Sequence, residues 1–552
     1  MDVFLQSERS DKVRVSCTRK AFRMVTRSRH ILACLTGVSL FLLAGIISLP
    51  GAAVQAPLEE LQQVQSLIQK GDLSAARERL DQTLKEFPSD FHLHNFLGVI
   101  QVQQGNDAAA EASFTKAIKL APRFAGAYLN LGRLYQQTGA REPEALRQSL
   151  EVYGRLLQFQ PGQTEARYQS AVLLLLLGEH EASQSHLSRL PADAQQRPQV
   201  LALRCSNLAR LGELQSATEA ARRLLASPGL SEADVVTALP FLEKPSERSL
   251  RQILLEGLVG RKLASSAALR QLGLLYEEQK QLDRARQALE AAAQDQSKLS
   301  SLLVDLARVA HKQGDHRGAL GYLAHARDLE PKNAGIHFFF GMVCVELELP
   351  LEARKSLQEA VALESDNAYY NYALASVLLQ DRDPSLSIPH FQKFMRLKPG
   401  DARGRLSLGV AYFYSNDFAK ARQELEDAAK YQETAAGAHY FLARVAKQEN
   451  HLPQALEHLE NSLKANPKYA DAHAELGLVY IRNREYDKAE RELLVALELD
   501  PESYLANLNL LNLFQRTKDS REDSQAQRFE EIKKKRSERQ QALMRTVEIR
   551  PY

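Results

Sequence analysis

"ELGLVYIRNREYDKAERELLVALELDP" (Glu475–Pro501) contains two apolar, helix-favouring segments separated by a short polar turn. A leucine–glycine pair lies near the start of the first segment, alanines recur along the second, and a proline ends the stretch. The same order is found much earlier in the chain, in "FLGVIQVQQGNDAAAEASFTKAIKLAP" (Phe96–Pro122). Apolar residues at helical spacing on both sides of a polar turn predict a helix-turn-helix unit that the chain repeats.

These two stretches resemble the tetratricopeptide repeat, a helix-turn-helix unit of 34 residues. The family has small residues at unit positions 8, 20 and 27, a large residue at position 24 and proline at position 32. With Gly98 at position 8, a unit starts at Phe91 and the other landmarks fall on Ala110, Phe114, Ala117 and Pro122. With Gly477 at position 8, they fall on Ala489, Leu493, Ala496 and Pro501. The tryptophan that the family favours at position 4 is missing, because the chain contains none.

Extended along the chain, this frame places unit starts at residues 57, 91, 125, 164, 198, 232, 266, 300, 334, 368, 402, 436, 470 and 504. Every interval is 34 residues except one of 39, and we expect the extra residues (Gly139–Ser149) to lengthen a turn or a second helix. The units at 164–197 and 232–265 and the last unit match the pattern weakly. Pro240 and Pro245 predict a kink or break in the first helix of the unit at 232–265.

The frame predicts an all-α protein, a right-handed α-solenoid of stacked units preceded by an N-terminal signal or transmembrane segment. Stacking is required because one helix pair has too little surface to bury by itself. We divide the repeats into an N-terminal array with degenerate units (57–265) and a well-patterned C-terminal array (266–503). Residues 504–552 are expected to form terminal capping helices and a charged tail, in which glutamates alternate with "KKKR" (Lys533–Arg536). That alternation favours a solvated face over nucleic-acid binding.

The N-terminus has the order of a secretory signal. A basic segment (1–30) precedes an uncharged apolar segment (31–49) and a small-residue linker (50–56), with cleavage points after Ala53 or Ala56. The apolar segment is also long enough to remain as a transmembrane anchor. Met24 is a second candidate for the true start. Basic residues before the apolar segment predict that the repeats are exported, whether the segment is cleaved or retained.

No pattern in the sequence indicates catalysis or a cofactor. The chain has 71 basic and 68 acidic residues, so its charge balance points to no nucleic-acid partner. Nucleophile-elbow, P-loop, dinucleotide-binding and HExxH motifs are absent. We interpret His311 and His316 as flanks of a polar turn and predict no metal site. Cys205 and Cys344 occur in no metal-binding motif and are expected to be buried free thiols.

The resemblance implies that the first helix of each unit lines a concave groove, with positions 2, 5, 9 and 12, and often position 6, pointing into it. The lysine–asparagine pair of the family's carboxylate clamp is absent, and aromatic and basic residues hold these positions in the C-terminal array. The predicted groove residues are Phe338, Phe339, Met342, Tyr369, Tyr372, Arg403, Phe413, Tyr440, Phe441, Arg444 and Lys447. The alternative is that curvature of the array buries some of them against the next unit.

These features predict an exported or membrane-anchored, non-enzymatic scaffold that binds a protein or peptide segment in its groove. The array would be periplasmic or extracellular, with contact to the membrane through residues 31–49 if that segment is uncleaved. The second hypothesis is an envelope assembly factor that acts by self-association or by organising several proteins.

Overall fold

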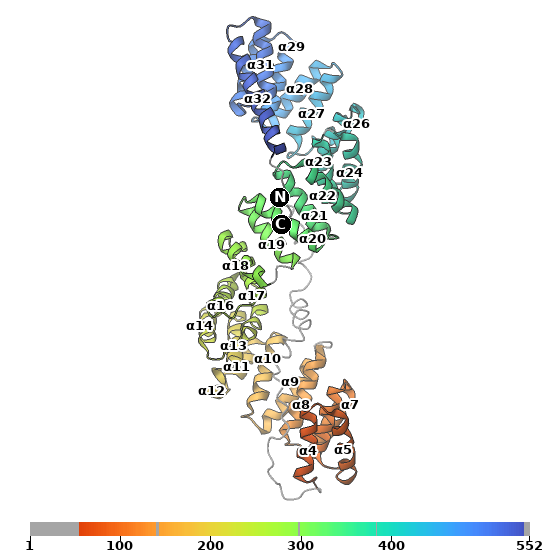
Figure 1. Ribbon diagram of the computed structural model, residues 1–552, viewed down its shortest axis with the longest axis vertical. Coiled ribbons are helices and arrows are strands. Elements are labelled where there is room, and N and C mark those ends of the chain that lie inside the picture. The colour runs from red at the N-terminus through yellow and green to blue at the C-terminus, as the bar shows by residue number, and fades with distance from the viewer. Residues whose placement is uncertain (1–54, 140–142, 296–298, 382, 546–552) are drawn as a thin grey trace. The chain divides into compact units, whose positions relative to one another are not determined.

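The computed structural model describes residues 55–139, 143–295, 299–381 and 383–545, and within these the regular structure is helical (Figure 1). The chain divides into two compact units, residues 1–295 and 296–552. The predicted signal or anchor at 31–49 and the basic segment before it lie outside the described residues. Among the helices that are described, none is both long and apolar enough to cross a membrane.

The first compact unit contains the helices of the seven predicted repeats from residue 57 onward. Their bounds are α4 (Leu58–Gln69), α5 (Leu73–Glu86), α6 (Phe91–Gln103), α7 (Asp107–Leu120), α8 (Ala125–Gly139), α9 (Pro143–Phe159), α10 (Thr164–Leu177), α11 (His180–Ser188), α12 (Ala192–Gln195), α13 (Pro198–Arg210), α14 (Leu214–Ala226), α15 (Glu232–Val236), α16 (Arg248–Gly260), α17 (Ser266–Glu278) and α18 (Leu282–Asp295). Two short 3-10 turns, η1 (Leu239–Phe241) and η2 (Pro245–Glu247), stand between α15 and α16.

The described residues of the second compact unit form seven further helix pairs. Their bounds are α19 (Ser300–Lys312), α20 (His316–Leu329), α21 (Ala334–Glu346), α22 (Pro350–Leu363), α23 (Ala368–Gln380), α24 (Pro384–Leu397), α25 (Ala402–Tyr414), α26 (Phe418–Ala428), α27 (Ala435–Gln448), α28 (Leu452–Ala465), α29 (Ala470–Arg482), α30 (Tyr486–Leu499), α31 (Tyr504–Thr517) and α32 (Glu522–Arg545).

The observed helices confirm the predicted frame. The first helix of every predicted unit begins within one residue of its predicted start. The five extra residues of the third unit lengthen its helices, since α9 alone has 17 residues. The two prolines break the first helix of the unit at 232 as predicted, because α15 stops at Val236 and only 3-10 turns follow. The division at residue 265 rests on repeat quality alone and stays a prediction.

The small and large landmark residues explain why each helix pair closes. A Cβ atom added to Gly477 would lie 2.6 Å from Cγ of Leu493, and one added to Gly341 would lie 2.7 Å from Cγ of Leu357. Position 8 therefore has to be small because the side chain at position 24 fills the space above it. The fully buried Phe114 occupies the same place over Gly98.

Position 4, where the family favours tryptophan, has a different role in this chain. His337 donates through Nε2 to the carbonyl oxygen of Pro331 at 2.8 Å, and Asn371 donates to the carbonyl oxygen of Ser365 at 2.8 Å. The same bond, to the residue six places earlier, is made by His94, Tyr128, Arg167, Arg405, His473 and Asn507. Polar position-4 side chains thus satisfy an orphan carbonyl at the end of the preceding helix.

The turn inside the units usually contains a residue with positive φ. Early units place glycine there, for example Gly105 at φ 75°. Several units of the C-terminal array place a side chain in the same left-handed conformation, at Lys280, Glu348, Asn416, Asn450 and Arg484. Such a conformation costs roughly 1–2 kcal/mol in an L-residue other than glycine or asparagine.

Both described cysteines are buried free thiols, as predicted. Burial raises the pKa of Cys205 to about 12, and it does the same for Cys344, with a smaller contribution from Glu352. Neither thiol therefore forms a reactive thiolate near neutral pH.

Histidines that are buried or half-buried predict a loss of stability in mild acid. Burial holds the pKa of His439 and His458 below the ordinary value of 6.5, and their Nδ1 atoms lie 3.2 Å apart, so a proton on one ring repels a proton on the other. Burial likewise lowers the pKa of His94, His180, His186 and His390. Because the unfolded chain then binds more protons, stability present above pH 6.5 is lost as the pH falls through the folded-state pKa values.

We therefore expect a lower urea midpoint at pH about 5 than at pH about 7.5. His458→Gln should reduce this difference, because it removes one member of the facing pair. Equal midpoints at the two pH values would contradict the assignment of neutral histidine rings in the folded protein.

Candidate functional site

An aromatic–arginine cluster joins two neighbouring first helices of the second compact unit. It consists of Phe413 and Tyr414 at the end of α25 and Tyr440, Phe441 and Arg444 on α27. The guanidinium carbon of Arg444 lies 4.6, 5.1, 5.5 and 5.6 Å from the ring centroids of Phe413, Phe441, Tyr414 and Tyr440, respectively. Arg444 also donates a 3.3 Å hydrogen bond to the Tyr414 hydroxyl. The rings and the cation therefore hold one another in place across two repeats.

A buried ion pair extends the cluster to the next first helix. Glu475 on α29 is buried, and its two carboxylate oxygens accept from Nζ of Lys447 at 2.5 and 2.9 Å. Nε of Arg444 lies 4.0 Å from the same carboxylate. The Glu475 carboxylate thus faces two cations, and the carboxyl group of Asp471 also interacts electrostatically with Arg444.

The environment keeps Arg444 charged. Burial by itself would lower the pKa of Arg444, but the proximity of Tyr440, the bond to Tyr414 and the Glu475 carboxylate together raise it. Burial raises the pKa of the adjacent Tyr469 to about 12, so that phenol stays protonated. The cluster therefore offers a fixed cation and neutral rings at physiological pH.

Exposure differs sharply within this cluster. Tyr414 is 49% exposed, Phe441 and Arg444 are half-buried, and Phe413 and Tyr440 are buried. The surface open to a partner is therefore made by Tyr414, Phe441 and Arg444, while the two buried rings support them from beneath.

The remaining predicted residues of α21 mostly pack within the protein. Phe338 is half-buried and stacks on Tyr370 of the next unit at a centroid distance of 4.7 Å. Phe339 is buried and lies edge-on to His311 at 5.9 Å. Met342 is half-buried. Phe340 and Ile336, which the frame assigned to packing, are buried.

The predicted residues on α23 and α25 are divided between packing and surface. Tyr372 is half-buried, lies 5.0 and 5.7 Å from the rings of Phe394 and Phe391, and its hydroxyl is 3.1 Å from Oγ of Ser407. Tyr369 is half-buried with the Lys398 ammonium 5.7 Å from its ring centroid. Arg403 is exposed and pairs with Asp401 at 3.3 Å.

The structure thus brings Phe413, Tyr440, Phe441, Arg444 and Lys447 together and buries Phe339, Phe413 and Tyr440. The partner-binding role of the predicted set stays a prediction. Two residues that complete the site were missed: Tyr414, which follows a predicted position directly, and Glu475, whose acidic side chain within an apolar helix was the available signal.

Contacts between helices indicate how neighbouring units pack together. Within the second compact unit, each first helix packs on its own second helix, and each second helix packs on the next first helix. Successive first helices also touch directly, as in α21 with α23, α23 with α25, α25 with α27 and α29 with α31. The aromatic–arginine cluster therefore lies where consecutive first helices meet.

Comparison with known families decides what these units are. A family model described as "Tetratricopeptide repeat" matches residues 61–123, 345–402, 406–450 and 442–504, and a second one with the same description matches residues 140–205. Together the matches cover about half of the chain. The chain belongs to the tetratricopeptide repeat family. Members of this family generally act as scaffolds that bind protein or peptide partners.

Solved structures with matching helices are distant relatives. "Structure of Naa15/Naa10 bound to HypK-THB" is 15% identical, covers 84% of this chain and 91% of that chain, and has a TM-score of 0.36. YrrB, titled "a TPR protein with an unusual peptide-binding site", is 20% identical over 40% and 95% of the two chains, with a TM-score of 0.25. PilW, titled "widely conserved type IV pilus biogenesis factor", is 19% identical over 38% and 98%, with a TM-score of 0.35. Because these TM-scores are low, we draw no functional conclusion from them.

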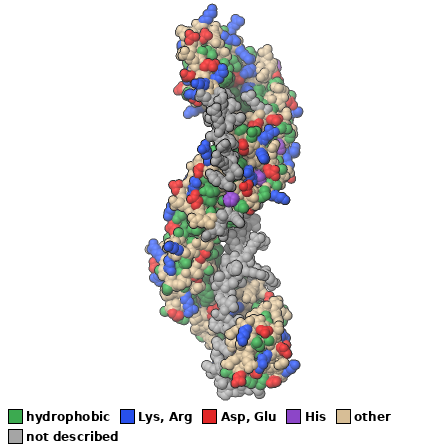
Figure 2. All heavy atoms as spheres, viewed as in Figure 1, with side chains coloured by type: hydrophobic (Ala, Val, Ile, Leu, Met, Phe, Trp, Pro, Cys, Tyr) green, Lys and Arg blue, Asp and Glu red, His purple; other side chains and the backbone are tan. Residues whose placement is uncertain are grey.

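No curated protein matches the sequence of this tetratricopeptide array. On the visible faces, basic, acidic and hydrophobic side chains are interspersed over the described parts of both compact units (Figure 2). This mixed surface agrees with the nearly balanced charge of the sequence.

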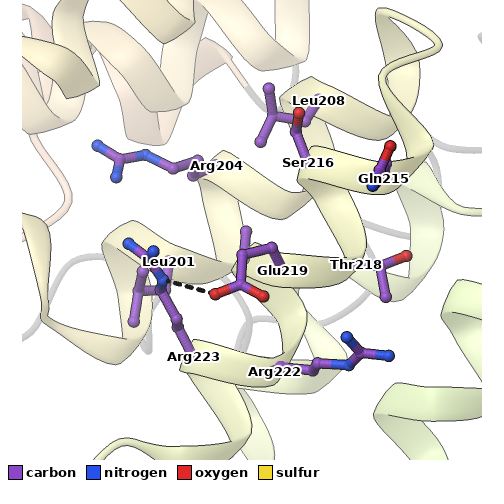
Figure 3. A pocket seen from close by; sticks show the side chains of 10 residues that line it. Leu201, Arg204, Leu208, Gln215, Ser216, Thr218, Glu219, Arg222 and Arg223 are labelled. Atoms are coloured by element: carbon purple, nitrogen blue, oxygen red, sulfur yellow. Dashed lines mark hydrogen bonds and ion pairs between the residues drawn. The ribbon is translucent and has the colours of Figure 1, made fainter.

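A pocket of about 680 Å³ opens between α13 and α14, in the tetratricopeptide unit at 198–231. Arg204, Arg222 and Arg223 line it, and Nε of Arg223 donates to Glu219 at 3.1 Å (Figure 3). Burial, with a smaller contribution from Arg223, lowers the pKa of Arg204, whose guanidinium donates to Gln195 at 3.1 Å. Because its arginines already have protein partners or diverge, the pocket is a weaker candidate than the aromatic–arginine cluster.

Proposed function

We propose that this tetratricopeptide protein is an exported or membrane-anchored scaffold that binds an extended segment of a protein partner at the aromatic–arginine cluster. The observation that carries the proposal is the group formed by Tyr414, Phe441 and Arg444 where first helices meet. Tyrosine, phenylalanine and arginine are the residue types that protein interfaces favour.

The cluster is suited to bind a peptide that presents a planar group, such as a peptide bond, or a carboxylate. The four neighbouring rings restrict the conformations of the Arg444 side chain. Binding of a partner to this guanidinium therefore costs less side-chain entropy than binding to a free arginine would. Arg444 lies 4.0 Å from the Glu475 carboxylate and donates to Tyr414, and a guanidinium has five N–H donors, so it can also donate to a carboxylate or a backbone carbonyl of the partner. Tyr414 adds a half-exposed ring beside it.

Export is supported by the order of residues 1–56 alone, a basic segment, an apolar segment and a small-residue linker. N-terminal sequencing of the protein isolated from its native membrane and soluble fractions tests this part. A new N-terminus near Ala53 or Ala56 indicates cleavage, an intact apolar segment in the membrane fraction indicates an anchor, and an uncleaved soluble protein contradicts export.

The binding proposal is tested with a displayed library of random peptides selected on the full-length chain. We expect enriched peptides that bind in a defined stoichiometry and lose binding when Tyr414 and Phe441 are both changed to alanine. Tyr431→Ala is the matched control, because this tyrosine is 43% exposed but lies outside the cluster. Peptides that bind both variants equally well would place the site elsewhere.

Self-association is the second candidate function. Leu351 on α22 and Leu386 on α24 are 73% and 48% exposed, and exposed leucines on outer helices can join copies of a chain. Size measurement of the full-length protein distinguishes the two candidates. A dimer that Leu351→Ser converts to a monomer favours self-association, and a monomer favours the scaffold proposal.

A further inference from the structure

Three side chains with metal-binding atoms meet between two tetratricopeptide units of the second compact unit. His311 lies near the end of α19, His316 begins α20, and Glu346 ends α21 in the following unit. Nε2 of His311 is 2.6 Å, and Nδ1 of His316 is 3.1 Å, from the same Oε2 of Glu346. All three ligand atoms lie within 4.8 Å of one another.

The turn between the two histidines fixes their spacing. Gly314 adopts φ 80°, and its N–H donates to the carbonyl oxygen of His311 at 2.9 Å. Asp315 then caps α20 by accepting from the N–H of Gly318 at 2.9 Å. The resulting H-x4-H spacing falls within the range found in zinc sites, and both rings are attached to helical backbone.

A second unit shows that packing alone does not require histidine here. His311 and His316 are the twelfth and seventeenth residues of their unit, with ring centroids 5.2 Å apart. In the unit that starts at Ala402, the same two positions hold Phe413 and Phe418, with centroids 5.9 Å apart. An apolar ring pair therefore fills this place elsewhere, and the unit at 300 uses two nitrogen ligands instead.

One ligand atom is left unsatisfied by the protein. Nδ1 of His316 is buried and makes no hydrogen bond with any described residue, although it is 3.1 Å from Oε2 of Glu346. This nitrogen and Nε2 of His311 both face the same Oε2 atom of Glu346. A buried imidazole nitrogen without a hydrogen bond is costly, and a metal ion at this place would remove the cost.

We propose that His311, His316 and Glu346 bind a divalent transition metal ion of the zinc class. Two imidazoles and one carboxylate are ligands that zinc accepts, whereas magnesium and calcium prefer oxygen ligands alone. Tetrahedral ligands about 2.0–2.1 Å from zinc are about 3.3 Å apart. The His316–Glu346 distance already matches this value, and the His311–Glu346 distance needs to open by less than 1 Å.

The bound ion would link the unit at 300–333 to the unit at 334–367. Three protein ligands would leave a fourth position for water, and the Phe339 ring lies edge-on to His311 at 5.9 Å. In a repeat array, where stability is the sum of unit and interface contributions, a metal across one interface stabilises both neighbours.

Cobalt titration of the untagged, metal-free, full-length protein tests this site. Tetrahedral cobalt absorbs visible light, so we expect visible absorption bands that saturate at one equivalent and disappear when zinc is added. His311→Gln, His316→Asn and Glu346→Gln should each weaken binding by more than the roughly 10–100-fold cost of losing a group that only hydrogen-bonds to a ligand. His473→Gln is the matched control, because His473 makes a 2.6 Å contact with Glu492 without a second histidine.

The double variant His311→Phe/His316→Phe separates metal binding from folding, because it copies the ring pair of the unit at 402. We expect it to keep the helical circular dichroism spectrum and to show no cobalt bands. Zinc should raise the melting temperature of the wild type, and it should leave the melting temperature of the double variant unchanged. Cobalt bands that persist in the double variant, or no saturable binding by the wild type, would overturn the proposal.

Discussion

Replacing Phe391 by alanine is expected to destabilise the neighbourhood of α23 to α25 by about 3–5 kcal/mol. Phe391 is 1% exposed, occupies position 24 of its tetratricopeptide unit, and packs with the buried Ala375 and with Tyr372. Removing the ring leaves a cavity that helices held by neighbours on both sides cannot close. Hydrogen exchange of the full-length protein should show amides in these helices exchanging at least about 100-fold faster.

Phe391→Leu is the matched control, because leucine occupies position 24 in several other units, including Leu357 and Leu493. It should cost less than about 1.5 kcal/mol. Amides in α30 and α31 should keep their protection in both variants, because repeats contact only their neighbours. Equal acceleration throughout the second compact unit would show that it opens as one cooperative block instead.

Arg444→Ala is expected to weaken the binding of peptides selected on the wild type by at least about 30-fold, which corresponds to about 2 kcal/mol. The change removes the positive charge. It also removes the planar guanidinium that packs against the rings of Tyr414 and Phe441. The Glu475 carboxylate keeps Lys447 as its partner, so the buried charge is not left alone. Fluorescence anisotropy with a labelled peptide measures the change in Kd.

Arg444→Lys tests the geometry of the side chain, because it keeps the charge and loses the flat guanidinium. We expect an intermediate loss of affinity. Arg396→Ala, at an exposed position on α24, is the control for a general loss of positive charge. If the peptides bind Arg444→Ala as tightly as the wild type, the cluster is a structural support and not a binding site.

The repeat frame was predictable because its landmarks depend on contacts within one unit. Gly341 and Leu357 belong to the same helix pair, so a small residue and a large residue sixteen places apart already describe their contact. Pro240 and Pro245 act on their own backbone, and the broken helix after α15 follows directly. Residues 31–49 were interpreted by the same local reasoning, and their role remains a proposal.

The candidate sites could be predicted only in part because they combine residues from different units. Phe413 and Phe441 were both predicted to face the groove. In the structure Phe413 is buried, with the ring of Phe441 from the next unit packed against it, whereas Phe441 itself is half-buried. Glu346 lies 35 residues from His311, and the polar turn around His316 gives no sign of it. The spacing of a repeat describes which residues share a helix face, whereas burial also depends on the size of neighbouring side chains.

The left-handed residues in the turns of the C-terminal array have a consequence for how the protein could be adapted. Lys280, Glu348 and Arg484 carry a backbone cost that Gly105 avoids in the same place. These turn residues lie outside the aromatic–arginine cluster and outside the helices. Replacing one of them should therefore change the stability of the protein without changing how the cluster binds a partner. The stability of the array can therefore be raised or lowered one turn at a time, by evolution or by engineering, while the residues of its binding surface stay the same.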